Sequence, residues 1–500
     1  MQTLKATAGT MPLPFENSYA RLPENFFARV SPTPVDAPRL IKLNRRLALE
    51  LRLDPQWLES PEGVEVLGGN RIPQGAEPIA AAYAGHQFGQ FVPQLGDGRA
   101  ILLGEVIDRA GVRRDIQLKG SGRTPFSRGG DGRAAVGPVL REYIVSEAMA
   151  ALGIPTTRAL AAVLTGESVA RETTLPGAVL TRIASSHIRI GTFQFFAARG
   201  DIEGIRALAD HVIARHYPDV RGSEAPYLAL LSAVIAAQAA LVARWMLVGF
   251  IHGVMNTDNM SVAGETIDYG PCAFMDAYDP ATVFSSIDRA GRYAYGNQGP
   301  VAQWNLARLA ETLLPLIADD QDEAVTLAQE ALGAFAPQFE AAFLTGMRRK
   351  LGLLTEEEGD LTLVKDLLDA MAASHADFTL MFRYLSEAAE ITIGDDRVAG
   401  LIAGAPAFEK WLGEWRQRIS REPQTGQERR TAMLQVNPLF IPRNHRVEAV
   451  IQAAVERDDF KPFEELLAVL DNPFDEQPDM AHYAEPPAPH ERVLQTFCGT

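Results

Sequence analysis

The stretch Gly249–Gly270, GFIHGVMNTDNMSVAGETIDYG, constrains what this chain can fold into more than any other part of it. An apolar run precedes four polar residues, His252, Asp258, Asn259 and Asp268, which fall within 17 residues. An Asn amide oxygen and an Asp carboxylate both suit Mg²⁺, which takes few protein ligands and completes its shell with water and phosphate oxygens. A lone Asp-x-Gly triplet is more often a polar loop, but the two clusters at this spacing predict a nucleotide–metal site.

The order of these residues follows most of a protein-kinase catalytic core, which reads H-R-D-x-x-x-x-N, a short hairpin and then D-F-G. His252 takes the first position, Asn259 the position of the Asn, and Asp268 that of the metal-binding Asp. Val254 stands where a kinase has its catalytic Asp, and a valine cannot accept a proton. Between the two clusters, Ser261–Ile267 is expected to form two short strands joined by a turn.

The composition permits a large enzyme. A chain of 500 residues exceeds the usual size of a single core, so two or three packed lobes are expected. Its net charge of −16 argues against a nucleic-acid-binding surface. The first residues lack a basic start followed by an apolar core, so no secretory signal is expected. Cys272 and Cys498 are too few for a disulfide framework, and a cytoplasmic location is expected.

The segment after residue 94 has the layout of a kinase nucleotide-binding lobe. A glycine turn, Leu95–Arg99, precedes a predicted strand over Ala100–Ile107, and a second strand over Arg114–Leu118 ends at Lys119. The full G-x-G-x-x-G loop of kinases is absent, and Gly-x-Gly-Arg alone is usually a hairpin turn.

The loop Gly120–Gly137 contains six glycines and three arginines, Arg123, Arg128 and Arg133. Glycine lets backbone N–H groups approach phosphate oxygens, and guanidinium groups bind phosphate through two parallel hydrogen bonds. A flexible basic loop explains the same composition. The position of the loop directly after Lys119 favours phosphate binding.

A helix is expected from Pro138 to Gly153, and its residues Glu142 and Glu147 are candidates to pair with Lys119. Three strands are expected after it, and a helix is expected near the N-terminus over Leu40–Leu51. The three strands are Ala159–Leu164, Val169–Glu172 and Ala178–Arg182.

The run Ala225–Ile251 is long and apolar enough to span a bilayer. Gln238, Arg244 and Ser232 make membrane insertion costly, and the run leads directly into His252. A buried core helix, with no membrane span, is therefore expected.

Several long motifs resemble the selenoprotein O family of kinase-like proteins, whose bacterial members carry Cys where the eukaryotic ones have selenocysteine. The motifs are YAGHQFGQF, LGDGRA, QLKGSGRTPFSRGGDGRA, LREYIVSEAM, HGVMNTDNMS, IDYGPCAF, NPLFIPRNHR and the Cys third from the C-terminus. They are spread over nearly the whole chain.

The resemblance implies an α+β, protein-kinase-like two-lobed fold: a β-rich N-lobe with an αC-type helix, a helical C-lobe, and additional elements at both ends. The implied segments are 1–75, an N-terminal extension packing on the core; 76–195, the nucleotide-binding N-lobe; 196–320, the C-lobe with the catalytic and metal loops; 321–470, a helical extension; and 471–500, a mobile tail with the terminal Cys.

The resemblance also implies an activity, because the family binds ATP in an inverted orientation and transfers AMP to Ser, Thr or Tyr hydroxyls of proteins. Asp258 would accept the hydroxyl proton, and Asn259 and Asp268 would hold Mg²⁺ or Mn²⁺. Residues implied to bind the nucleotide are Lys119 (positioned by Glu142), Arg182, Arg189, Asp268, Gly96, Gly98, Arg99, Asp131 and Gly132.

Three alternatives stay open at this point: a conventional phosphotransferase, a non-catalytic nucleotide-binding scaffold, and transfer of UMP from UTP. The absence of an Asp at Val254 counts against the first, and the joint presence of Lys119, Asn259 and Asp268 against the second. The resemblance further implies a redox-active residue at the terminal position. Cys272 and Cys498 are therefore expected to form a reversible disulfide that alters access for protein substrates.

Overall fold

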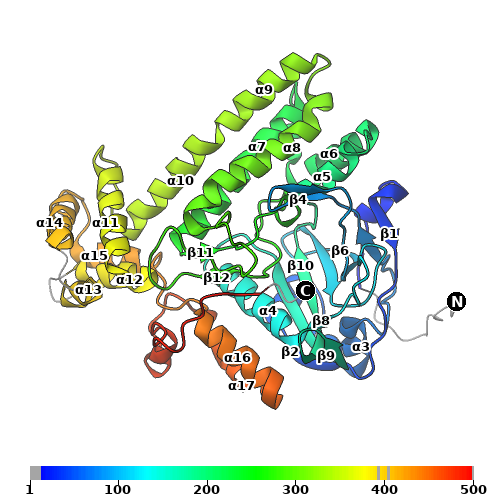
Figure 1. Cartoon of the computed structure of the whole chain (residues 1–500), viewed down its shortest axis with the longest axis horizontal. Coiled ribbons are helices and arrows are strands. Elements are labelled where there is room, and N and C mark those ends of the chain that lie inside the picture. The colour runs from blue at the N-terminus through cyan, green and yellow to red at the C-terminus, as the bar shows by residue number, and fades with distance from the viewer. Residues whose placement is uncertain (1–12, 391–394, 403–405, 498–500) are drawn as a thin grey trace.

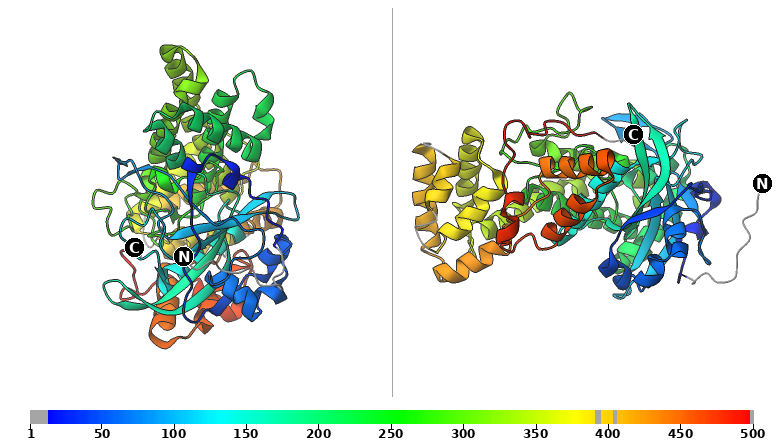
Figure 2. Two further views of the ribbon diagram at one scale, coloured as in Figure 1. Left: turned by 90° about the vertical axis from the view of Figure 1, so that its right-hand side faces the viewer. Right: turned by 90° about the horizontal axis from the view of Figure 1, so that it is seen from below.

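The computed structural model describes residues 13–390, 395–402 and 406–497. Strands dominate the first part of the chain and helices the rest. Most of the later helices lie away from the sheet, and the last ones return to it (Figures 1 and 2). The result is a mixed α/β protein with an antiparallel sheet and a helical C-terminal region. The two-lobed kinase arrangement and the five segment boundaries given above stay predictions.

The main sheet has eight strands in the order β1-β3-β6-β7-β10-β9-β2, with β8 paired to β10. Its central strands are buried along most of their length, because helices cover both faces. Leucines and valines of α1 and α3 pack on one face, and α4 packs on the other, with α16 and α17 over α4. The strands are β1 (Phe27–Arg29), β2 (Arg39–Leu43), β3 (Ile79–Ala81), β6 (Ala100–Ile107), β7 (Arg113–Lys119), β8 (Ala134–Ala135), β9 (Arg158–Ala170) and β10 (Thr174–Ala184). Two further two-stranded sheets are β4 (Gly85–Gln87) with β5 (Gln90–Val92), and β11 (Phe250–Ile251) with β12 (Ala273–Phe274).

The helices of the first half flank the sheet and the candidate site. They are α1 (Arg45–Glu50), α2 (Pro55–Leu58), α3 (Pro61–Gly68), α4 (Val136–Ala151), α5 (Ile190–Ala197), α6 (Ile202–His216) and α7 (Pro226–Leu247). The helices of the second half are α8 (Gln298–Ile317), α9 (Gln321–Gly333), α10 (Phe335–Lys350), α11 (Asp360–Ser374), α12 (Phe378–Ala388), α13 (Asp395–Leu401), α14 (Pro406–Ile419), α15 (Gly426–Leu434), α16 (Asn444–Arg457) and α17 (Lys461–Leu470).

Helix α7 packs against α8, α9 and α10 (Figure 1). In the described part of the chain it is the one helix with the length and hydropathy of a membrane span, and half of its most apolar window is buried against these neighbours. It ends at Leu247, earlier than expected, because Gly249 adopts a left-handed conformation and Phe250–Ile251 pairs as β11.

Three expectations for secondary structure are wrong. Leu40–Leu51 is a strand followed by a short helix, because Asn44 accepts a hydrogen bond from the N–H of Leu47 and starts α1 there. The three strands expected over residues 159–182 are two long ones, β9 and β10, because register shifts accommodate the irregular residues without ending the strands. Ser261–Ile267 is no hairpin: Ser261 pairs with Arg189, and Thr266 with Thr156.

The tail beyond α17 is not wholly extended. Pro478–Tyr483 forms a short 3₁₀ helix, and the guanidinium of Arg443 donates to the carbonyl of Ala484 at 2.9 Å. Further on, Thr496 forms a parallel bridge with Ser285, so the described end of the chain lies against the loop that follows β12.

Candidate active site

Asp268 lies at the centre of a cluster of three cations. Arg182 Nη1 lies 2.5 Å from Asp268 Oδ1, Lys119 Nζ lies 3.3 Å from the same oxygen, and Arg189 pairs with Oδ2. Burial opposes ionisation of this carboxyl, but the charges of Arg189, Arg182 and Lys119 hold the pKa of Asp268 well below its usual range. Asp268 has a φ of 61°, a left-handed conformation that costs a non-glycine residue free energy and is typical of functional sites.

The pairing of β7 with β10 brings two of these cations together. Arg182 lies opposite Gln117 in the ladder, so Lys119 and Arg182 project from the same face of the sheet. Gln117 Oε1 accepts from the Arg182 guanidinium at 2.5 Å and fixes its orientation. On α4, Glu142 pairs with Lys119 at 2.5 Å and with Arg182 at 3.2 Å. Glu147, the other helix candidate, pairs instead with Arg158.

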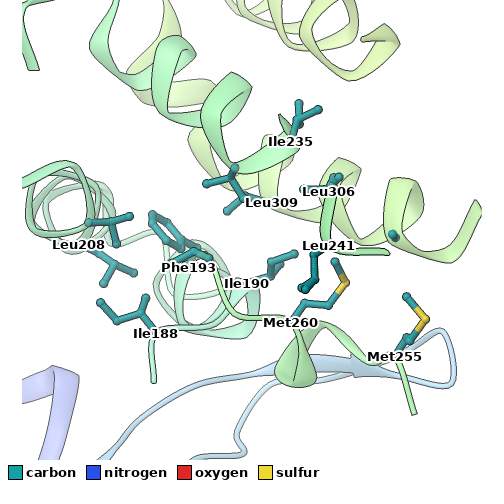
Figure 3. Close-up of a cluster of buried hydrophobic side chains, with 14 of the residues drawn as sticks. Ile188, Ile190, Phe193, Leu208, Ile235, Leu241, Met255, Met260, Leu306 and Leu309 are labelled. Carbon is teal, nitrogen blue, oxygen red and sulfur yellow. The ribbon is translucent and has the colours of Figure 1, made fainter. Parts of the chain in front are cut away.

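The loop that carries Asp258 and Asn259 is held by the main hydrophobic core. Met255 and Met260, on either side of the 3₁₀ turn Thr257–Asn259, insert among apolar side chains from α5, α7 and α8 (Figure 3). Burial of these two apolar side chains stabilises the position of the loop.

Polar contacts complete this anchoring. Asn305 on α8 donates to the carbonyl of Met255 at 2.8 Å, and Thr257 donates to Gln194 on α5 at 2.6 Å. His252 is fully buried and contacts the carbonyl of Ile267 at 2.9 Å. It therefore supports the loop from behind and does not line the cavity described below.

Asp258 has the environment of a proton acceptor. It is 7% exposed, and burial raises its pKa to about 6. Gln87 donates to its Oδ2 at 3.1 Å, while no group of the described residues donates to its Oδ1. Gly85 leaves room for that oxygen, since a Cβ there would lie 2.6 Å from it. A carboxylate with one unpartnered oxygen and a pKa near neutrality suits general-base chemistry.

Asn259 and Asp268 were expected to bind a metal, and their donor atoms fit one. The Asn259 amide donates from Nδ2 to the carbonyl of Val254 at 3.0 Å, which leaves Oδ1 as the atom that can act as a ligand. The described residues contain no cluster of three or more His, Cys, Asp or Glu side chains. One carboxylate and one amide oxygen suit Mg²⁺ or Mn²⁺ that also binds phosphate oxygens.

These side chains face a cavity of about 560 Å³ that also meets the two glycine-containing loops. The residues predicted from the sequence that line it are Gly96, Gly98, Arg99, Lys119, Asp131, Gly132, Arg182, Arg189, Asp258, Asn259 and Asp268. Gly132 has a φ of 70°, and a Cβ there would lie 2.1 Å from the carbonyl oxygen of Gly122. The loop can close over the cavity only with glycine at this position.

Comparison with known proteins shows which family builds this site. The profile of the family described as "Protein adenylyltransferase SelO" matches residues 10–471. The chain belongs to the protein adenylyltransferase SelO family. Two similar relatives, both called "Protein nucleotidyltransferase YdiU", come from Rhodopseudomonas palustris. The one from strain BisB5 is 70% identical over 98% of this chain and 100% of its own length. The one from strain BisB18 is 71% identical over 97% of this chain and 99% of its own length. A third of the same name, from Bradyrhizobium diazoefficiens, is 69% identical over 98% and 100%. This chain is therefore a protein nucleotidyltransferase.

The arginines of the glycine-rich loop have different roles within this SelO-family site. Arg128 and Arg133 line the cavity, whereas Arg123 does not. Arg133 donates to the carbonyls of Thr33 and Pro34 and pairs with Glu167, so its guanidinium secures the loop to the rest of the fold.

Sequence reasoning missed several residues of the cavity, among them Tyr83, Phe126 and Arg171. Tyr83 stacks under the guanidinium of Arg189 at 4.6 Å, and Phe126 contributes an aromatic wall. Arg171 pairs at 2.8 Å with Asp131 and so fixes one side of the loop. Tyr83 and Phe126 fall inside the motifs that carry the family resemblance, and an aromatic residue in such a motif was the available signal.

The two cysteines cannot be compared directly, because Cys498 lies outside the described residues. Cys272 is buried, two residues after Gly270, in the loop that follows Asp268, Tyr269 and Gly270. Thr496 donates to the carbonyl of Pro271 at 2.7 Å. Thr496, two residues before Cys498 in the sequence, is therefore bonded to Pro271, the residue before Cys272.

Proposed function

We propose that this SelO-family nucleotidyltransferase transfers AMP from ATP to Ser, Thr or Tyr hydroxyls of proteins and releases pyrophosphate. The observation that carries the proposal is the arrangement of Asp258 and Asp268: a carboxylate with an unpartnered oxygen lies in the same cavity as a carboxylate surrounded by three cations. The first suits proton transfer, and the second marks where a triphosphate binds.

Lys119, Arg182 and Arg189 would bind the phosphates. In the absence of nucleotide their charge is offset by Asp268 and Glu142. A triphosphate competes for the same guanidinium and ammonium donors, and burial makes each such contact stronger than it would be in water. Because all three cations line the same cavity as Asp258, they would stabilise the negative charge that builds up on pyrophosphate as it leaves.

Asp258 would act on the acceptor. Its Oδ1 takes the proton from the substrate hydroxyl, whose oxygen bonds to the α-phosphorus while the bond from that phosphorus to the bridging oxygen of pyrophosphate breaks. The second oxygen of Asp258 stays bonded to Gln87, and the backbone carbonyl of Asp258 accepts from Arg189 at 2.5 Å. These contacts hold the carboxylate in place while it gains the proton.

Mg²⁺ or Mn²⁺ would be held by Asn259 Oδ1 and Asp268. Bound there, the ion supplies Lewis-acid stabilisation of phosphate charge. The three cations around Asp268 disfavour binding of a bare metal ion, so metal and nucleotide are expected to bind together.

Redox control is the finer part of the proposal. A disulfide between Cys272 and Cys498 would tie the tail to the loop after the metal-binding triplet, in a protein that we place in the cytoplasm. The support is the bond from Thr496 to the carbonyl of Pro271. Oxidised protein should yield a Cys272–Cys498 peptide, and Cys498→Ser should remove the response of activity to a dithiol reductant.

The nucleobase is the remaining choice, because the relatives' shared name specifies only a nucleotidyl group. Incubating the protein and a lysate of soluble proteins with ATP labelled at the α or γ position, or with UTP labelled at α, separates the possibilities. Label from the α position of ATP is expected. Label from the γ position would indicate a phosphotransferase, and a stronger signal from UTP would indicate UMP transfer. No label from any of the three nucleotides would reject all three activities.

A further inference from the structure

A second cavity, of about 570 Å³, shares no lining residue with the nucleotide cavity. It lies where the C-terminal ends of α7 and α10 meet the turn between α4 and β9, with α15 and the tail completing the wall; Figure 1 shows α7 and α10 side by side. A close approach of the two helices forms part of it, since a Cβ on Gly346 would lie 2.1 Å from Leu247.

The charged side chains that line this cavity are all basic: Arg244 on α7, and Arg349 and Lys350 on α10. No Asp or Glu of the described part of the chain lines it, in a protein whose net charge is −16. Arg244 donates to the carbonyl of Gly153 at 3.3 Å, and no described carboxylate forms an ion pair with the exposed Arg349. Such a concentration of one sign of charge favours anions.

Lys350 is the side chain that distinguishes this cavity from an ordinary basic surface. It is only 4% exposed, and its ammonium lies 4.2 Å from the ring centroid of Phe382 and 5.8 Å from that of Phe378. No carboxylate or carbonyl of the described residues pairs with the ammonium. Burial lowers its pKa to about 7. Burying a charge without a partner costs free energy, which aromatic faces offset only in part.

We propose that this cavity binds an organic anion with an apolar body, whose carboxylate or sulfonate group pairs with Lys350 and Arg349. The charged group follows from the three cations and the absence of acids. The apolar body follows from the rest of the lining, which includes Ile154, Val436 and Phe474. Thr345 and Gln435 are the uncharged polar side chains there, too few to recognise the many polar groups of a nucleotide or sugar.

The cavity is also connected to the candidate active site. The turn that Arg244 contacts continues to Pro155, whose carbonyl accepts a hydrogen bond from Thr266, two residues before Asp268. A ligand that orders this turn would therefore lie one short segment away from the triphosphate site. Binding of an anion in this cavity does not depend on the reaction proposed above.

The test uses 8-anilinonaphthalene-1-sulfonate, an aromatic sulfonate, titrated by fluorescence into the full-length protein, with decanoate as the competitor. Lys350→Met removes the ammonium and keeps most of the volume, and Arg349→Gln removes an exposed charge with little risk to folding. Each should raise the dissociation constant about tenfold or more, since hydrogen bonds to charged groups contribute that much. Lys365→Met, the same change on the exposed face of α11, is the matched control and should leave the dissociation constant unchanged.

Thr345→Trp supplies a variant that leaves the charges intact, because the larger side chain fills the cavity. It should also abolish binding, while calorimetric titration with ATP should give the wild-type affinity in all four variants. The proposal is overturned if both charge variants bind the sulfonate as tightly as the wild type. It is equally overturned if ATP displaces the sulfonate, because the probe would then occupy the nucleotide cavity.

Discussion

The two cavities of this protein both contain buried cations, and they differ in how that charge is balanced. In the nucleotide cavity, Arg182 and Arg189 are each 2% exposed and pair with Asp268. In the cavity beside α10, Lys350 is almost as buried and faces aromatic rings in place of a carboxylate.

The difference shows what each cavity requires of its ligand. Asp268 compensates the cations before a nucleotide arrives, so the empty site is stable, and the phosphates must replace existing ion pairs. Among the described residues, none compensates the charge of Lys350, and a bound anion would be its first partner of opposite charge. The balanced cluster is therefore suited to exchanging ligands during a reaction, whereas the unbalanced one gains stability from keeping its ligand bound.

The largest effect is expected from breaking the balanced cluster at its centre. Asp268→Ala removes both the anionic metal ligand and the partner of three cations, so transfer should be abolished and ATP binding should lose its metal dependence. Leaving buried cations without a partner should also lower Tm by several degrees. A radiolabel transfer assay and calorimetric unfolding measure the two effects, with the exposed Asp319→Ala as the control. Retained transfer would show that Asp268 is a structural counterion.

The next effect concerns proton transfer. Asp258→Ala should slow transfer about 10²–10⁴-fold and leave ATP affinity largely intact, because the variant loses a base and no phosphate contact. The wild-type kcat/KM should fall as pH drops below about 6, since burial raises the pKa of Asp258 to about 6 and only the ionised form accepts a proton. The variant should lack this limb. Equal loss of ATP binding in the Asp258 and Asp268 variants would mean that Asp258 has a different role.

A smaller effect should separate phosphate binding from folding. Arg189→Gln should weaken ATP by about tenfold or more and adenosine much less, because only ATP carries the phosphates that the guanidinium binds. Arg46→Gln, on the exposed face of α1, is the matched control and should leave both affinities unchanged. Calorimetric titration of both ligands distinguishes the cases. A similar loss for ATP and adenosine would indicate that Arg189 supports the fold.

Local patterns were enough to predict the long helices α4 and α7, because the apolar residues that mark them lie close together in the sequence. The failed hairpin over Ser261–Ile267 shows the limit. Its two ends pair with Arg189 and Thr156, far away in sequence, so no local signal distinguished them from strands that pair with each other. Likewise, register shifts let β9 and β10 continue where turns were expected, and register is set by the neighbouring strands.

Some residues of the candidate site could be predicted from the local sequence, and others could not. Asn259 and Asp268 stood out because they are close in sequence, and their spacing alone predicted a metal site. Arg182 and Arg189 gave no signal of their own; the pairing of β7 with β10 and the start of α5 bring them to Asp268. Lys350 was missed altogether, because a lysine in the last turn of a helix is the usual sequence pattern at an exposed C-terminus.

The smallest expected effect is a pH-dependent change in stability caused by Lys350. The folded-state pKa of Lys350 is about 7, below the usual value of a lysine in an unfolded chain, about 10.4. Between these two pKa values the unfolded state binds more protons than the folded state, so Lys350 makes the free energy of unfolding rise with pH. Below pH 7 the free-energy cost of burying the charged ammonium is fully present. The charged groups on the surrounding helices are Arg244, Arg349 and Arg383. Lys350→Met should therefore raise Tm relative to the wild type by a few degrees at pH 6 and by less at pH 9, while Lys365→Met should change it equally at both. A Tm difference between Lys350→Met and the wild type that does not vary with pH would mean that the ammonium is already compensated, and the contrast between the two cavities would then disappear.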